Sequence, residues 1–195
     1  MKRSGIALLI AGLMYATTAM AGPFGLDMGM TIKEVGGKPE KIANGKYKLT
    51  SVPKPHSAFE SYLVQVSPKG GLCWIKAIGK DIPTSVYGLE LKSAFNEMKG
   101  KLEKAYGEHN TIDMLLPGSI WTESNEFMQA LIKKERVLAA IWDSESGSTL
   151  KDNIKQIGLL ANPIVRNKGY IAIEYSFSNV EACEAELAAQ EDGAL

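Results

Sequence analysis

The chain has few of the residues that usually carry catalysis or bind metals. Its 195 residues include only two histidines and two cysteines, and no two of these four have the short spacing of zinc ligands. A Gly-x-Ser-x-Gly elbow, a phosphate-binding glycine loop and a Ser-x-x-Lys set are also missing. We therefore expect no catalytic residues, no cofactor and no metal site.

An excess of charge of either sign is missing as well. The 22 Lys and Arg residues equal the 22 Asp and Glu residues, and the two signs are interleaved along the chain. Nucleic-acid binding normally needs a basic face, and docking to a membrane surface needs clustered Lys and Arg. Neither nucleic acid nor a membrane surface is expected as a partner.

The first 21 residues, MKRSGIALLIAGLMYATTAMA, have the pattern of a secretory signal peptide. Lys2 and Arg3 precede an apolar run over 6–14, and the small residues of Ala19-Met20-Ala21 precede Gly22. The run is short for a membrane span of about 20 residues, so cleavage after Ala21 is favoured over a retained anchor. Because no cysteine stands just after the proposed cleavage site, a lipoprotein is not indicated. We expect a soluble periplasmic or secreted protein with 20 basic residues, 22 less Lys2 and Arg3, against 22 acidic ones.

The two cysteines, Cys73 and Cys183, form an even pair in a chain expected to reach an oxidising compartment, which predicts one disulfide. Cys73 alternates with Ile75 and Ala77 on one face of a predicted strand, and Cys183 shares a helical stripe with Leu187. Both sulfurs are therefore expected to point toward a core. A redox-active pair is the alternative, but such pairs usually have Cys-x-x-Cys spacing.

An internal match suggests a duplicated unit. The segment FGLDMGMTIKEVGGKPEKIAN at 24–44 aligns without a gap with YGLELKSAFNEMKGKLEKAYG at 87–107. Chance is the alternative, because Lys, Glu and Gly are common. The match divides the chain into a first α+β unit at 22–82 and a second at 83–195, which includes a C-terminal helix.

Periodicity predicts helices packed on a mainly antiparallel sheet, a two-layer α+β fold. The second copy reads as an amphipathic helix that ends at Gly107, and Gly100 in its interior hints at a close packing contact. Thr31 with Glu34, and Ser178 with Glu181, have capping-box spacing. The other expected elements are strands at 47–52, 59–66, 72–78, 137–142, 154–161 and 170–177, and a short helix at 125–134.

A helical start followed by a three-strand meander, repeated once, resembles the BamE-like lipoproteins and the tandem β-lactamase-inhibitor-protein fold. The resemblance rests on PFGLDMGMTIKEV and its second copy, and its pattern spans most of residues 22–195. Members of these families act by binding other proteins, so the resemblance implies an interaction module. It assigns no site residues, and the missing lipobox cysteine departs from the lipoprotein branch.

Three features are the remaining candidates for chemistry. His56 and His109 lie in turn-like segments and are expected to be solvent-exposed rather than paired. The segment 143–147 alternates Asp, Ser and Glu before a glycine, but the third ligand and the closing Glu of a calcium loop are absent, so a turn is favoured.

The tryptophans Trp74, Trp121 and Trp142 are each expected in the core on general grounds, yet an exposed one would suit an interface. Trp74 follows Cys73, so simple alternation directs it to the face opposite the disulfide, and it is the candidate interface residue.

The leading hypothesis is a binding or inhibitory module whose partner is another envelope protein, with an open sheet face that retains Trp or Tyr. An envelope hydrolase would instead need a deep pocket with converging carboxylates or both histidines. A small-ligand carrier would need an enclosed apolar cavity.

Overall fold

The structure is a computed structural model that describes residues 22–193. The predicted signal peptide at 1–21 and its cleavage site lie outside the described residues. Within residues 22–193, no helix is both long and apolar enough to cross a bilayer.

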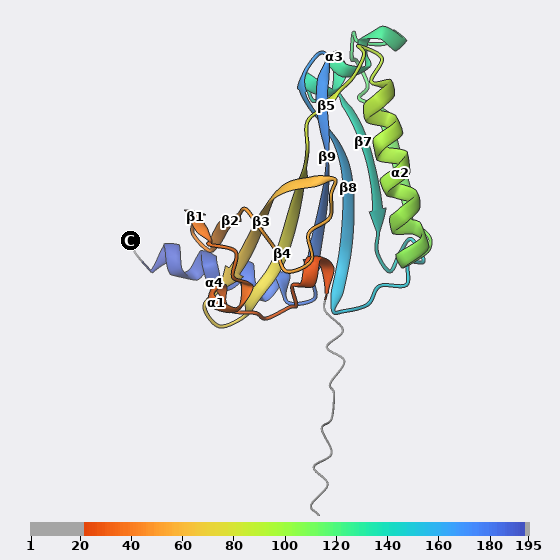
Figure 1. Cartoon of the computed structure of the whole chain (residues 1–195). Helices are drawn as coiled ribbons and strands as arrows, with labels where there is room; N and C mark the ends of the chain where they lie inside the picture. Colours follow the sequence, from red (N-terminus) through yellow and green to blue (C-terminus); the bar gives the residue numbers. More distant parts are fainter. Residues whose placement is uncertain (1–21, 194–195) are drawn as a thin grey trace, which may run out of the picture.

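Residues 22–193 form nine strands and four α-helices (Figure 1). The strands are β1 (Glu40–Ala43), β2 (Lys46–Leu49), β3 (Phe59–Ser67), β4 (Gly71–Gly79), β5 (Ile82–Pro83), β6 (Asn110–Leu115), β7 (Arg136–Trp142), β8 (Ile154–Val165) and β9 (Lys168–Phe177). The helices are α1 (Ile32–Val35), α2 (Leu89–Tyr106), α3 (Phe127–Ile132) and α4 (Val180–Asp192), with 3-10 turns η1 (Pro23–Gly25) and η2 (Ser124–Glu126). The predicted α+β class is confirmed.

All the strands belong to one antiparallel sheet with the order β1-β2-β3-β4-β9-β8-β7-β6, and β5 pairs with β9 at its side. The strands β4 and β9, each the last long strand of its predicted unit, therefore pair with each other at the centre of the sheet. The main hydrophobic core contains buried residues from both sides of the expected boundary at residues 82 and 83. The division into two units stays a prediction.

One face of the sheet, here called the helical face, carries α2 and the main core. The α2 residues Leu91, Phe95, Met98 and Leu102 are buried in that core, as the 3.6-residue period predicts. Tyr106, at the end of α2, contacts Tyr175 of β9 with ring centroids 6.5 Å apart. Figure 1 shows α2 running alongside β7 and β8.

The sheet has a β-bulge at Cys73, and this corrects the predicted placement of Trp74. Gln65 of β3 pairs with Trp74, but the next residue, Val66, pairs with Leu72, so Cys73 is the extra residue. Leu72 and Ile75 consequently join the main core, whereas Cys73 forms a separate cluster with Cys183 and Leu187. Alternation across the bulge directs Cys73 away from the helical face, to the same side as Trp74. The expectation that Trp74 lies opposite the disulfide was wrong.

The first predicted capping box is confirmed and the second is wrong. Thr31 Oγ1 accepts from the Glu34 N–H, and Glu34 accepts from the Thr31 N–H, at the start of α1. At α4 the N-cap is Asn179, which makes no capping hydrogen bond with its side chain. The Asn179 amide instead donates to the carbonyl oxygens of Gly70 and Leu72, so its side chain fastens the helix start to β4.

Gly100 has no close neighbour, contrary to the sequence-based expectation. A Cβ built at Gly100 meets nothing within 4 Å, and the residue lies inside α2 without a positive φ. We predict that Gly100→Ala raises the free energy of unfolding by about 1 kcal/mol, because alanine loses less backbone entropy in a helix. Urea unfolding monitored by circular dichroism measures it.

Gly88→Ala is the matched comparison for this substitution. Gly88 has φ +68°, and a Cβ there would lie 2.4 Å from the Phe127 ring, so this variant is expected to be destabilised. Equal effects of the two substitutions would contradict the assignment of Gly100 as an open helical position.

Candidate functional site

The face of the sheet opposite the main core, here called the open face, is not covered by α2. Cross-strand register places its side chains in rows, because directly paired residues point to the same side. Within these rows Gln65, Ala139 and Ala172 are buried, whereas the residues that form the surface of the open face are partly exposed. Its central residues are Ser61, Leu63, Trp74, Lys76, Ile78, Gly158, Leu160, Tyr170, Glu174 and Ser176.

An ion pair lies at the centre of the open face. Lys76 Nζ is 2.8 Å from Glu174 Oε1, and the two residues are direct partners across β4 and β9. Their side chains are 24% and 30% exposed, so the pair sits in a half-desolvated environment. Trp74 and Ile78 flank Lys76 along β4 on the same side. The result is a charged pair surrounded by apolar surface.

The helix α4 covers one end of the open face, where the disulfide joins it to β4. The sulfurs of Cys73 and Cys183 are bonded at 2.06 Å, and both residues are fully buried. The predicted disulfide is therefore present. Figure 1 places α4 near β3 and β4, at the opposite end of the molecule from α3.

A carboxylate of α4 adds a second contact to this end of the sheet. Glu186 accepts hydrogen bonds from the N–H groups of Lys69 and Gly70, which belong to the turn between β3 and β4. The Ser67 hydroxyl, and then these N–H groups, lower the pKa of Glu186. The ionised form of Glu186 is the form that holds the turn.

An acidic groove of about 450 Å³ adjoins Trp74. Its lining includes Ser176, the direct partner of Trp74, and continues over β8 to α4. The carboxylates in the lining belong to Asp143, Glu145, Glu181 and Glu184. Lys155 pairs with Glu181, which leaves the groove with an excess of negative charge.

Asp143 in the acidic groove lacks the raised pKa that a general acid needs. Asp143 accepts from the Ser146 N–H at 2.8 Å, and that hydrogen bond lowers the Asp143 pKa, which is the opposite of what a general acid needs. The same contact closes 143–147 into a turn, as the sequence predicts. Among residues 22–193, no cluster of three or more His, Cys, Asp or Glu side chains could hold a metal ion.

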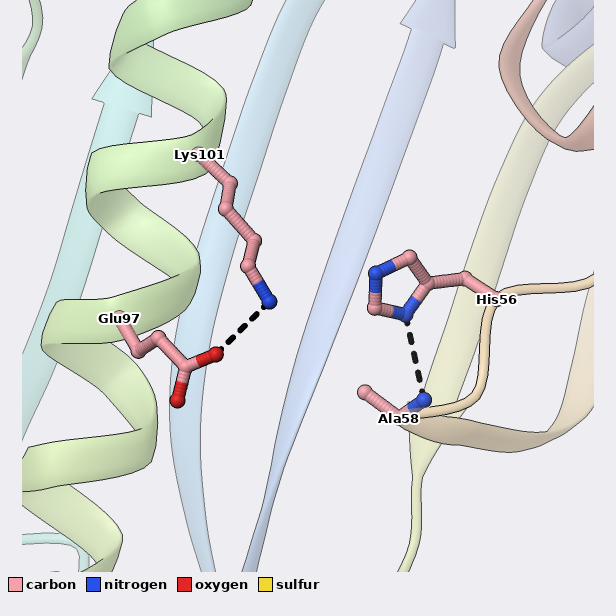
Figure 2. A network of polar contacts seen from close by, with 4 residues as sticks. All are labelled: His56, Ala58, Glu97 and Lys101. Atoms are coloured by element: carbon pink, nitrogen blue, oxygen red, sulfur yellow. Dashed lines mark hydrogen bonds and ion pairs between the residues drawn. The ribbon is translucent and has the colours of Figure 1, made fainter.

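The two histidines lie in different environments. His56 Nδ1 accepts from the Ala58 N–H at 3.1 Å, opposite the Glu97–Lys101 pair of α2 (Figure 2). His109 follows the end of α2 and stacks on Trp142, with centroids 4.8 Å apart. The helix rises about 1.5 Å per residue, so its end at Tyr106 lies about 13 to 14 Å beyond Glu97. The histidines therefore form no pair, and each is partly rather than fully exposed.

The tryptophans differ from one another in burial. Trp142 is fully buried and donates from Nε1 to the Gly107 carbonyl, so the core expectation is confirmed for it. Trp74 and Trp121 are partly exposed. Of the two, Trp74 lies on a rigid central strand, whereas Trp121 lies in the segment between β6 and α3.

Comparison with known proteins adds no assignment, since no family model, no curated protein and no solved structure matches the chain.

We predict that Cys73→Ser/Cys183→Ser lowers the free energy of unfolding by at most about 4 to 5 kcal/mol. Breaking a bridge between residues 110 positions apart frees the unfolded chain from a long closed loop. Urea unfolding with tryptophan fluorescence measures the change. Wild-type protein reduced with dithiothreitol should match the variant, and an unchanged midpoint would contradict a stabilising bridge.

We also predict that Glu186 makes stability sensitive to acid. A carboxyl whose pKa is lowered by folding adds stability above its ordinary value of 4.5 and loses it as the pH falls through the folded value. Glu186→Gln should therefore lower the free energy of unfolding more at pH 7 than at pH 3. Urea unfolding of both proteins at both pH values measures the difference. The control is Glu184→Gln. Glu184 lies two residues earlier in α4 and accepts no such N–H hydrogen bonds among the described residues. An equal cost of Glu186→Gln at both pH values would exclude the role.

Proposed function

We propose that this chain is a protein-binding or inhibitory module that acts in the bacterial periplasm after residues 1–21 are removed. The single observation that carries the proposal is the open face: a central, partly exposed Trp74 beside Ile78 and the Lys76–Glu174 pair, on a sheet whose other face is packed. Tryptophan is the residue type most enriched among binding hot spots.

Rigidity of the scaffold supports this proposal. Trp74 sits on β4, which is paired on both sides, with β3 and β9. The disulfide fixes the residue immediately before it, and Asn179 holds the neighbouring carbonyl groups. A binding surface whose side chains are already held in place loses little conformational entropy on association.

Charge also indicates what kind of protein surface fits. The groove beside Trp74 is lined by four carboxylates and one lysine, so the partner is expected to place a basic side chain there and an apolar patch on Trp74. The partner would be another envelope protein. Electrostatic complementarity of this kind raises the association rate and makes it salt-dependent.

The tandem organisation and the resemblance to BamE-like and β-lactamase-inhibitor-protein units belong to the same proposal. The strand order, in which β1 to β4 and β6 to β9 meet at their last strands, supports two related units. An interaction role agrees with what that resemblance implies.

We predict that Trp74→Ala weakens binding by about thirtyfold or more, because truncating a central tryptophan costs about 2 kcal/mol or more. Tagged protein starting at Gly22 is used to isolate a partner from an envelope extract, and the dissociation constant is then measured with purified components. Trp121→Ala, which removes a partly exposed tryptophan outside the open face, should leave the constant unchanged.

Two results would reject the proposal. One is a stoichiometric partner that binds wild type and Trp74→Ala equally. The other is the absence of any stoichiometric partner in extracts prepared under several salt conditions.

A further inference from the structure

The sheet splits at the end distant from α4, where β7 and β8 separate. Their register runs from Trp142↔Ile157 to Ala139↔Leu160 and stops. Beyond that point β7 continues to Arg136 beside β6, and β8 continues to Val165 beside β9. Each strand therefore keeps its outer partner and, within the described residues, has no strand partner on its inner side.

The unpaired backbone groups can be identified from the hydrogen-bond alternation. The Leu116 N–H donates to the Glu135 carbonyl at 2.7 Å, so the backbone groups of Glu135 point toward β6. Because the direction alternates along a strand, every second residue after Glu135 also points its N–H and C=O groups toward β6. The intervening residues, Arg136 and Leu138, point their N–H and C=O groups toward β8. By the same alternation Ala161 and Pro163 of β8 point toward β7. The last pair, Ala139 and Leu160, keeps the Ala161 N–H within the ladder, whereas the Leu138 N–H, both backbone groups of Arg136 and the Pro163 carbonyl have no strand partner among the described residues.

Proline explains why the two strands do not close. Pro163 has no N–H to donate at a position that faces β7, so one rung of the ladder cannot form there. The α3 residues Leu131 and Ile132 lie beneath the split on the helical face, and α3 contacts both strands. The space that remains is a groove of about 450 Å³.

The lining of this groove, here called the split groove, has a defined chemistry. Aliphatic residues form most of it, among them Leu131, Val137 and Ile164. Among the described residues that line it, Lys134 and Arg136 at the mouth are the charged ones, and none is a carboxylate. Arg136 is paired with Asp113, whereas Lys134 is exposed.

We propose that the split groove binds an extended segment of a partner protein, inserted between β7 and β8 as an added strand. The segment would carry aliphatic side chains at alternate positions, facing Leu131 and Ile132, and an acidic side chain at the mouth near Lys134. Unpaired strand edges are a template for such pairing, and the excess of positive charge in the lining selects the acidic residue. The proposal does not depend on Trp74, although the split groove shares Leu160 and Tyr170 with the open face.

The test uses a synthetic peptide, acetyl-Glu-Val-Ser-Val-Ser-Leu-amide with a fluorophore, and the whole protein from Gly22. Fluorescence anisotropy measures binding, and hydrogen–deuterium exchange locates it. We expect the amides of Arg136 and Leu138 to exchange rapidly in the free protein and to become protected by the peptide, with the Ala161 amide, inside the β7–β8 ladder, as the protected reference. Replacing Glu by Lys in the peptide, or methylating its central backbone nitrogens, should abolish binding.

Matched variants distinguish binding in the split groove from non-specific binding of the peptide elsewhere on the protein. Lys134→Glu should weaken the peptide at least fivefold, and the adjacent Lys133→Glu, outside the lining, should not. Ile164→Ser should weaken it as well, whereas Ile42→Ser should not; the two isoleucines are 44% and 49% exposed, and Ile42 belongs to β1 at the other edge of the sheet.

Several outcomes would overturn the proposal. These are protection of the Arg136 and Leu138 amides in the free protein, absence of binding at millimolar peptide, and binding that the Lys134 and Ile164 variants leave unchanged. Protection that rises with protein concentration in the absence of peptide would assign the split groove to a second copy of this chain instead.

Discussion

The pairing of β4 with β9 is the constraint on which the other features depend. It sets Ile75 opposite Tyr175 on the helical face and Lys76 opposite Glu174 on the open face. Because side chains alternate, a slip of one residue would move each set to the wrong side of the sheet. It also joins a meander from the first half of the chain to one from the second, so that the core is continuous across both.

The bulge at Cys73 determines which face of the sheet carries the disulfide and α4. Without an extra residue, Cys73 would point into the main core alongside Ile75, and α4 would have to compete for space with Phe24, which packs there against Tyr62 and Tyr175. The bulge returns Leu72 to the core and sends Cys73 to the other side, where Cys183 meets it. The helix α4 is thereby attached to the open face, and it leaves the surface from Trp74 onward uncovered.

Much of this architecture could be predicted from the sequence, for identifiable reasons. The strand at 170–177 and the helix before Gly107 have strong periodic patterns, and both formed as expected. The strands β1 and β6 were missed because they are short edge strands that are mostly exposed, so neither has a continuous buried face to mark it. The position of Trp74 could not be predicted, since a bulge depends on pairing with β3 and leaves no mark in the local pattern of β4. The split groove depends likewise on where the β7 and β8 register ends, which is a property of two strands and a helix together.

The two surfaces follow from one imbalance in how the sheet is covered. A nine-stranded sheet with four helices has more strand surface than its helices can pack against, and α2 and α3 are both committed to the helical face. Among the helices of residues 22–193, only α4 reaches the open face, and the disulfide holds it at one end. At the other end α3 occupies the space beneath β7 and β8 without closing their edges. Leu160 and Tyr170 lie between the two surfaces and belong to both, so a partner seated on Trp74 and a strand inserted at the split groove would meet there. One protein that supplied both elements would bind more tightly than either contact alone, because the second contact would form at a high effective concentration.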